Sequence, residues 1–272
     1  MTTVFEVRTM EISRTNIDNG NKFDWGKASQ DYAKYRDIYP EEFYKKLVEL
    51  GIGIKGQKVL DIGTGTGVLP RNMYSYGAEW TGTDISAEQI AQAKALSENG
   101  GMDIDYFACP AEKLGDIESR FDVLTACQCY WYFEHEKTAP QFSGLLNEGG
   151  KVAFLMMNWL PFEDEIAGKT EELVLKYNPE WTGGGDKMKP MFVPEPYLEY
   201  FDVEDSGEFL LNVHFTRESW NGRIRACRGI GASSLTEEQK SEWEKEHLAM
   251  LADHPQEFDI KHYAAYVVLK KK

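Results

Sequence analysis

The segment Asp61–Gly67 reads D-I-G-T-G-T-G and directly follows the apolar residues Val59 and Leu60. Alternating glycines after an apolar stretch turn a strand into a helix, and a bulky ligand can approach their backbone because no Cβ intervenes. The spacing differs from the dinucleotide fingerprint G-x-G-x-x-G, whose third glycine would fall on Val68 or on Pro70. A carboxylate beside such a turn is also unfavourable for phosphates, which bind at the start of the helix. The turn therefore predicts a site for a ligand with a cationic group and no phosphate.

A second acid, Asp84, stands 17 residues after Gly67, at the end of the next expected strand. A carboxylate in that place can accept hydrogen bonds from both hydroxyls of a ribose, and Ile85 beside it offers an apolar surface for adenine. S-Adenosylmethionine combines adenosine with an ammonium and a sulfonium and carries no phosphate. Asp61 and Asp84 therefore favour this cofactor. The alternative interpretation is two polar strand ends and a tight turn.

These residues are positioned by alternating strands and helices. We expect strands at Lys58–Ile62, Glu79–Asp84, Met102–Ala108, Phe121–Ala126 and Lys151–Met157. We expect helices at Val68–Tyr76, Ala87–Glu98 and Glu134–Asn147, the second of them starting at the capping box Ser86–Gln89. Short strands separated by helices imply right-handed crossovers and a parallel sheet. The ligand site then lies at the carboxyl ends of the first two strands, where the strand order reverses.

The rest of the chain is expected to complete and cover that site. Residues 1–26 are expected to form an N-terminal arm, and the helical residues that follow form a cover with a break at Tyr39-Pro40. Residues 158–200, rich in tryptophan, glycine and proline, are expected to form an irregular inserted lid. We expect the last elements at Glu208–Phe215, Arg217–Gly229, Thr236–Ala252 and Tyr263–Lys270, with the two strands antiparallel.

Together these elements predict one α/β domain over residues 27–272. Its sheet is twisted, mostly parallel and seven-stranded, with helices on both faces. Residues 27–157 form the cofactor-binding core, and residues 201–272 supply C-terminal strands and substrate-side helices.

Over Gln30–Met157 the chain resembles the class I S-adenosylmethionine-dependent methyltransferases, whose marker is a D-x-G-x-G-x-G turn. Asp31–Arg36 (D-Y-A-K-Y-R) is similar to the Y-x-x-Y-R helix of the subgroup of ubiquinone-biosynthesis and trans-aconitate methyltransferases, with a type 11 methyltransferase domain. Cys109–Leu114 resembles the family's A-P-A-E-x-L segment, and Cys127–Phe133 resembles its A-Q-A-x-H-W-F segment. The resemblance implies a Rossmann-like fold and methyl transfer from S-adenosylmethionine to a small molecule, with S-adenosylhomocysteine as product.

The resemblance also implies roles for individual residues. Tyr32 and Arg36 are expected near the methionine carboxylate, and Glu112 near adenine. The cofactor-binding residues implied are Tyr32, Arg36, Asp61, Gly63, Thr64, Gly65, Gly67, Asp84, Ile85, Ala111, Glu112 and Cys127. Gln128 and Trp131 are expected to contact the substrate.

Tyr130 is the candidate catalytic residue, and it stands where the family more often has histidine. A phenol can donate a hydrogen bond to a substrate or act as a weak base, although its reference pKa of about 10 is high for a base. Methyl transfer is an in-line displacement in which the enzyme mainly orients and desolvates the reactants. A base is needed only where the attacking atom must lose a proton.

Four arginines form a basic cluster near the C-terminus. At helical spacing Arg217, Arg225 and Arg228 share a face, with Arg223 offset. We expect Arg223 and Arg228 to bind an anionic group of the substrate, and the alternative is a solvated face paired with surface acids. The aromatic candidates for the walls of the substrate cavity are Trp25, Tyr32, Tyr130, Trp131, Trp159 and Trp181.

Composition limits the class of partner. The 272 residues include 30 Lys and Arg against 45 Asp and Glu, and the resulting charge of −15 argues against nucleic acid or an anionic membrane as partner. The cysteines Cys109, Cys127, Cys129 and Cys227 form no C-x-x-C pair and accompany no histidine cluster, which argues against a metal site. Residues 127–129 are expected in a strand-like setting, with the two thiols on opposite faces. Reduced thiols and the lack of a signal peptide or membrane span predict a cytoplasmic protein.

Two other functions remain compatible with these residues. One is a non-catalytic protein that binds S-adenosylmethionine. The other is a nicotinamide-dependent oxidoreductase, which the glycine spacing and Asp61 disfavour.

Overall fold

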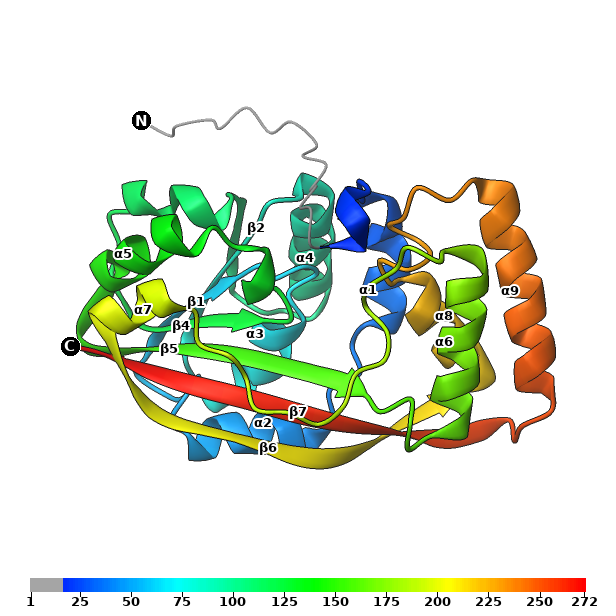
Figure 1. The fold of residues 1–272 in the computed structure, drawn as a ribbon. Coiled ribbons are helices and arrows are strands. Elements are labelled where there is room, and N and C mark those ends of the chain that lie inside the picture. Colours follow the sequence, from blue (N-terminus) through cyan, green and yellow to red (C-terminus); the bar gives the residue numbers. More distant parts are fainter. Residues whose placement is uncertain (1–16) are drawn as a thin grey trace.

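One sheet runs through the computed structural model. The structure describes residues 17–272, so most of the predicted N-terminal arm lies outside the described residues. Within these residues the sheet has seven strands in the order β3-β2-β1-β4-β5-β7-β6 (Figure 1). The strands are β1 (Lys58–Ile62), β2 (Glu79–Asp84), β3 (Asp105–Ala108), β4 (Phe121–Cys127), β5 (Leu146–Trp159), β6 (Phe201–Thr216) and β7 (Glu257–Lys271). Strands β1 to β5 pair in parallel, and β7 is antiparallel to both β5 and β6. The predicted α/β fold with an antiparallel addition is confirmed.

Helices cover both faces of the sheet. They are α1 (Ser29–Tyr35), α2 (Glu41–Glu49), α3 (Val68–Met73), α4 (Ala87–Asn99), α5 (His135–Leu145), α6 (Glu165–Tyr177), α7 (Glu195–Tyr200), α8 (Arg217–Arg225) and α9 (Glu237–Ala252). Short 3₁₀ turns are η1 (Asp18–Gly20), η2 (Trp25–Ala28), η3 (Tyr74–Tyr76), η4 (Ala111–Asp116) and η5 (Tyr130–Tyr132). The predicted break before Pro40 is confirmed, because α1 ends before it and α2 begins after it.

The core follows the alternation of side chains along the strands. In β1, Val59 belongs to one buried cluster with Leu47 of α2, whereas Leu60 belongs to another with Phe142 of α5. Successive residues of a strand point to opposite faces, so two apolar neighbours bury both sides of a central strand. This arrangement fixes the carboxyl end of β1 between two helical layers.

The long strands β5, β6 and β7 extend beyond the parallel part of the sheet. Figure 1 shows helices α1, α6, α8 and α9 gathered at the carboxyl end of β5, at the end of the molecule away from the C-terminus. Helix α8 packs against α1 and α9, and α6 packs against α9. These helices therefore form one packed group beyond the carboxyl end of β5.

The inserted segment contains a helix that the sequence analysis did not predict. Residues 158–200 were expected to be irregular, but α6 begins at an N-cap, Asp164, whose side chain accepts a hydrogen bond from Ala167 N at 3.0 Å. Ala167 and Val174 are buried in the main core. The glycines and prolines that suggested irregularity lie mostly after α6, in residues 179–196. This part of the expected lid is therefore core structure.

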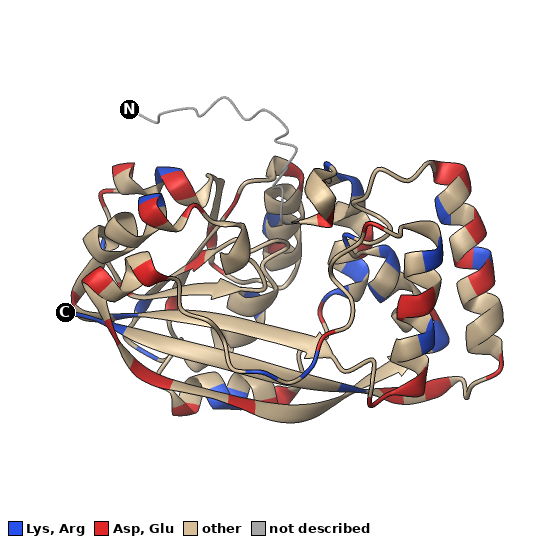
Figure 2. Cartoon of the chain, viewed as in Figure 1, with Lys and Arg blue, Asp and Glu red and all other residues tan. Residues whose placement is uncertain are grey.

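Charge is spread over the outer surface. Figure 2 shows acidic and basic residues interspersed on the outer helices α5, α6 and α9. Among residues 17–272 no helix is both long and apolar enough to cross a membrane.

Candidate functional site

Two adjoining pockets lie at the carboxyl ends of the central strands. The turn pocket is lined by Trp25, Tyr32, Arg36, Ile62, Gly63, Gly65, Asp84, Ile85, Gln89, Cys109, Ala111, Glu112, Cys127, Gln128, Cys129, Tyr132 and Phe133. The insertion pocket is lined by Ile17, Trp25, Arg36, Gln128, Tyr130, Trp131, Tyr132, Met156, Asn158, Trp159, Trp181, Thr182, Gly183, Gly184, Asp186, Lys189, Arg223, Cys227 and Arg228. Four residues line both pockets: Trp25, Arg36, Gln128 and Tyr132.

The glycine turn forms the floor of the turn pocket. Gly63, Gly65 and Gly67 have φ angles of +69°, +57° and +74°, a conformation that side chains disfavour. A Cβ on Gly63 would lie 2.6 Å from the sulfur of Cys129, and a Cβ on Gly65 would lie 3.3 Å from the ring of Tyr32. The glycines therefore expose backbone where any side chain would fill the pocket.

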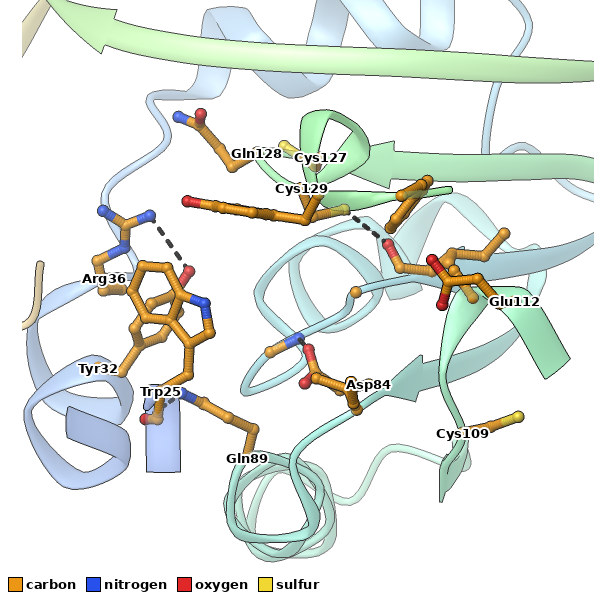
Figure 3. Close-up of a pocket in the computed structure, with 17 residues that line it drawn as sticks. Trp25, Tyr32, Arg36, Asp84, Gln89, Cys109, Glu112, Cys127, Gln128 and Cys129 are labelled. Atoms are coloured by element: carbon orange, nitrogen blue, oxygen red, sulfur yellow. Dashed lines mark hydrogen bonds between the residues drawn. The ribbon is translucent and has the colours of Figure 1, made fainter. Parts of the chain in front are cut away.

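Asp84 ends β2 and holds this turn in place. One carboxylate oxygen accepts a hydrogen bond from Gly65 N at 2.9 Å (Figure 3), and the other accepts one from Ser86 N at 2.9 Å. Burial raises the pKa of Asp84, while these backbone hydrogen bonds oppose the rise. Because both oxygens are oriented by backbone groups, Asp84 is a fixed acceptor on the wall of the pocket.

Asp61 lies behind the turn rather than on the surface of the pocket. Its side chain is 2% exposed and accepts a hydrogen bond from the Thr125 hydroxyl at 2.6 Å. Burial raises the pKa of Asp61 to about 6, and the charge of Asp84 adds to the rise. Thr64 and Gly67 also support the turn without lining the pocket, joined by a hydrogen bond of 2.9 Å from Gly67 N to Thr64 O. Of the predicted cofactor-binding residues, these three are the ones outside the lining.

Tyr32 and Arg36 face the turn from helix α1 and the residue after it. Arg36 Nη2 donates to the Tyr32 hydroxyl at 3.2 Å, and the guanidinium lies 4.6 Å from the centre of the Tyr32 ring. Figure 3 shows this pair across the pocket from Asp84 and Glu112. The turn pocket thus has a cationic side and an acidic side.

The segments after β3 and β4 complete the turn pocket. Glu112 accepts a hydrogen bond from Glu134 N at 2.9 Å, and Ala111 and Ile85 add apolar surface. Strand β4 ends at Cys127, and Gln128 has a φ of +64°, which bends the chain. Cys127 and Cys129 both line the turn pocket, but Cys127 packs against the buried cluster of Val59 and Cys129 against that of Leu60, in agreement with the expected opposite faces. All four cysteines are free.

Some lining residues were not predicted for the turn pocket, among them Gln89 and Trp25. Gln89 was expected to close a capping box, and Ser86 Oγ does accept from Gln89 N at 3.2 Å. The Gln89 side chain, however, donates to Trp25 O at 3.3 Å, because Ser86 N is already bound by Asp84. Only one of the two hydrogen bonds of the capping box forms, and the Gln89 side chain instead links the segment before α1 to helix α4. A polar residue in a capping motif gives no sequence signal for this second role.

The insertion pocket contains every residue predicted to act on the substrate. Gln128, Tyr130, Trp131, Arg223 and Arg228 all line it. The ring of Tyr130 is buried and stacks on Phe154, with 4.9 Å between ring centres. Burial raises the pKa of Tyr130, so its hydroxyl stays protonated at neutral pH and is a poor base.

The four arginines have different surroundings, and the predicted grouping is wrong for Arg228. Helix α8 ends at Arg225, so Arg228 no longer follows the helical spacing. Arg225 pairs with Asp31 at 2.6 Å and Glu244 at 2.5 Å, and it lines neither pocket. Arg217 donates to the carbonyl of Ala252 at 3.0 Å.

Two arginines of this cluster line the insertion pocket, and one of them, Arg228, forms an ion pair with Asp18 at 2.5 Å. Arg223 lies over Trp159, with 5.1 Å between the guanidinium and the ring centre. Within residues 17–272 no three His, Cys, Asp or Glu side chains lie together so that they could hold a metal ion.

Comparison with known proteins identifies the central segment. Residues 59–150 match the family model described as a methyltransferase domain. Over 153 residues the chain is 36% identical to the ubiquinone biosynthesis O-methyltransferase of Bradyrhizobium sp. strain ORS 278, covering 54% of this chain and 58% of that protein. It is 30% identical over 158 residues to the enzyme of the same name from Coxiella burnetii strain RSA 331, covering 55% of this chain and 66% of that one. The chain therefore spans about three fifths of the length of these relatives.

Solved structures agree on the fold. A structure from work on the conversion of a disulfide bond into a thioacetal group in echinomycin biosynthesis has a TM-score of 0.54 at 16% identity, covering 86% of this chain and 82% of that one. The structure of YjhP from E. coli has a TM-score of 0.51 at 18% identity, covering 90% and 99% of the two chains. At these identities the likeness extends to the fold alone.

Proposed function

We propose that this chain, which carries a class I S-adenosylmethionine-dependent methyltransferase domain, transfers a methyl group from S-adenosylmethionine to a small molecule bound in the insertion pocket. The observation that carries the proposal is the turn pocket, where an exposed glycine backbone lies at the carboxyl end of β1, with Asp61 buried behind it and Asp84 on the pocket wall at the end of β2. The match of residues 59–150 to a methyltransferase domain supports it.

The residues of the turn pocket fit this cofactor. The two oxygens of Asp84 are held by backbone groups, so they are oriented to accept hydrogen bonds from ribose hydroxyls. Ile85 and Ala111 supply apolar surface for adenine, beside Glu112. A side chain on Gly63 or Gly65 would fill the space that the cofactor needs.

Charge fixes the direction in which the cofactor binds. Arg36, with the Tyr32 hydroxyl beside it, would hold the methionine carboxylate. Asp61, buried behind Gly63 and supported with Thr64 and Gly67, would place negative charge near the ammonium. The methionine end of the cofactor would then be held at the junction of the two pockets, since Arg36 lines both.

When bound, S-adenosylmethionine supplies a methyl group on a sulfur that leaves readily. The chain then has to orient the attacking atom in line with that bond and to exclude water. Gln128 lines both pockets and is held by a hydrogen bond to the carbonyl of Met157, so it can position an acceptor at the junction. Tyr130 and Trp131 contribute a wall of the insertion pocket. We propose that Tyr130 acts as a hydrogen-bond donor to the acceptor, because its raised pKa disfavours proton abstraction.

The setting of the reaction is part of the proposal. The four free cysteines support a reducing compartment, the cytoplasm. The charge of −15 supports a small acceptor over nucleic acid or an anionic membrane. The names of the relatives, which refer to ubiquinone biosynthesis, also support a small-molecule acceptor.

Calorimetry with S-adenosylhomocysteine tests the cofactor, and product analysis tests the reaction. We expect binding in the micromolar range, and methylated product from at least one member of a panel of carboxylic acids, phenols, amines and thiols. Absence of binding would refute the proposal as a whole. Binding without any product would favour a non-catalytic protein that binds the cofactor, and binding of NADH alone would favour an oxidoreductase.

A further inference from the structure

Arg223 is a buried arginine that no acid neutralises within residues 17–272. Its residue is 2% exposed and lines the insertion pocket from helix α8. Its Nη1 donates to the sulfur of Cys227 at 2.7 Å, and its guanidinium lies over the ring of Trp159. Its Nε is buried without a hydrogen-bond partner. A sulfur is a weak acceptor, so the guanidinium keeps donor capacity that these contacts do not use.

Two other cations of the insertion pocket, Arg228 and Lys189, are compensated by acids. Arg228 pairs with Asp18 at 2.5 Å, and Lys189 pairs with Asp186 at 2.7 Å. The buried acid Glu171 does not reach Arg223, because its oxygens accept from Trp159 Nε1 at 2.6 Å and Gly185 N at 2.7 Å. Across residues 17–272, neither Arg36 nor Arg223 has a carboxylate oxygen within ion-pair distance.

Two positive charges therefore remain without counter-ions, and they occupy different places. Arg36 lines both pockets, whereas Arg223 lines the insertion pocket alone. Burial lowers the pKa of Arg223, and the charge of Arg36 lowers it further. A buried charge without a partner costs several kcal/mol, and a bound anion removes that cost. When the methionine carboxylate of the cofactor binds Arg36, the charge of Arg223 is still available to bind a second anion.

The walls around Arg223 are aromatic. Trp131, Trp159 and Trp181 line the same cavity, and Trp159 already lies under the guanidinium. Flat aromatic walls favour a planar ligand, and a guanidinium fork matches the geometry of a carboxylate.

We propose that the methyl acceptor is an aromatic carboxylate and that Arg223 is the residue that binds its carboxylate and selects for it. The inference rests on the proposed function, because it assigns the acceptor of the same reaction. Arg228 is not part of this selection, since Asp18 already neutralises it.

Matched acid and amide pairs test the selection directly. Benzoate against benzamide, and indole-3-acetate against indole-3-acetamide, are titrated into protein saturated with S-adenosylhomocysteine. In each pair the two compounds have nearly the same shape and differ in charge. We expect the acid to bind at least about tenfold more tightly than the amide in one or both pairs, because its contact with Arg223 is charge-assisted. Equal affinity within both pairs, or no acid binding at millimolar concentration, would overturn the proposal.

Variants assign the preference to Arg223. Arg223→Gln should remove the preference for the acid and leave the affinity for S-adenosylhomocysteine within about twofold, since Arg223 does not line the turn pocket. Arg225→Gln is the matched control, because it removes the same charge two residues away on α8 from a side chain that lines neither pocket. It should keep the preference. If both variants keep it, Arg223 is not the selecting residue.

Thermal unfolding separates a binding role from a structural one. Arg223→Met replaces an uncompensated buried charge with an apolar chain of similar length, so the ligand-free variant should unfold at a higher temperature than the wild type. A lower unfolding temperature would mean that Arg223 serves the fold and would contradict the proposal. Failure of the wild type to bind S-adenosylhomocysteine would refute the proposed function first, whereas cofactor binding without acid preference would refute this inference alone.

Discussion

The turn pocket and the insertion pocket share four residues but differ in how they are built. The turn pocket draws mainly on residues 62–133, which are the strand ends and turns of the parallel sheet. The insertion pocket draws on segments from residue 17 to residue 228, including the inserted segment and the end of α8. Its cavity is also larger, about 410 Å³ against about 110 Å³.

The difference shows which pocket is formed by short segments of the chain and which is formed by residues far apart in the sequence. The turn pocket depends on backbone conformation, since Gly63 and Gly65 expose amides and Asp84 fixes them. The insertion pocket depends on large side chains from distant elements, such as Trp159 and Arg223. Mutations should therefore separate cofactor binding from acceptor binding.

The largest effect is expected for Asp84→Ala. The variant loses the acceptor for the ribose hydroxyls and the hydrogen bond that holds Gly65, so the affinity for S-adenosylhomocysteine should fall about 100-fold, as for two charge-assisted hydrogen bonds. Calorimetry measures it. Glu79→Ala is the matched control, since it removes an exposed acid from the opposite end of β2 and should leave the affinity unchanged. An unchanged affinity in Asp84→Ala would remove the basis for the cofactor assignment.

The substitution Asp61→Asn should change how the free energy of unfolding depends on pH. Because the pKa of Asp61 is raised to about 6, the folded protein holds a proton that the unfolded chain releases at lower pH. The free energy of unfolding of the wild type therefore falls as pH rises from about 4 to about 6, by on the order of 2 kcal/mol. Asparagine does not titrate and can still accept from Thr125, so the variant should be more stable than the wild type above that window.

Urea unfolding over a pH series measures this effect, with the cofactor absent. The same variant should bind S-adenosylhomocysteine more weakly, because a charge near the ammonium is lost. Parallel pH curves for the variant and the wild type would show that Asp61 is not the group that titrates.

Trp131→Ala should affect the insertion pocket alone. Loss of one aromatic wall should weaken binding of indole-3-acetate about fivefold, in line with about 1 kcal/mol for an aromatic contact, while the affinity for S-adenosylhomocysteine stays the same. Phe162→Ala is the control, because Phe162 is an aromatic residue of the inserted segment that is 67% exposed. Equal losses for both ligands would contradict the separation of the pockets.

The smallest effect is expected for Arg225→Gln. Arg225 joins α1 to α9 through Asp31 and Glu244, but its side chain is 32% exposed, so solvent weakens the ion pairs. The free energy of unfolding should fall by about 1 kcal/mol or less, with no change in either ligand affinity. Urea unfolding measures it, and a loss of cofactor affinity would show that α1 is positioned through this contact.

Much of the turn pocket could be predicted because its chemistry follows from short segments. The spacing D-I-G-T-G-T-G and the acid at the end of the next strand place Gly63, Gly65 and Asp84 on one pocket. The contribution of Gln89 could not be predicted, because it depends on Trp25, which is 64 residues away. Helix α6 was missed since the glycines and prolines that follow it dominated the composition of the segment.

Taken by itself, the sequence determined the parallel sheet, the glycine turn and the acids beside it, because these depend on local periodicity and on backbone conformations that only glycine adopts readily. The sequence also predicted that Arg223 and Arg228 bind an anionic group of the substrate, without distinguishing between them. Only the tertiary structure decided that Asp18 neutralises Arg228 and that Arg223 has no acid beside it. The effective charge of a side chain depends on which distant residues fold against it, and the spacing of residues along the chain does not contain that information.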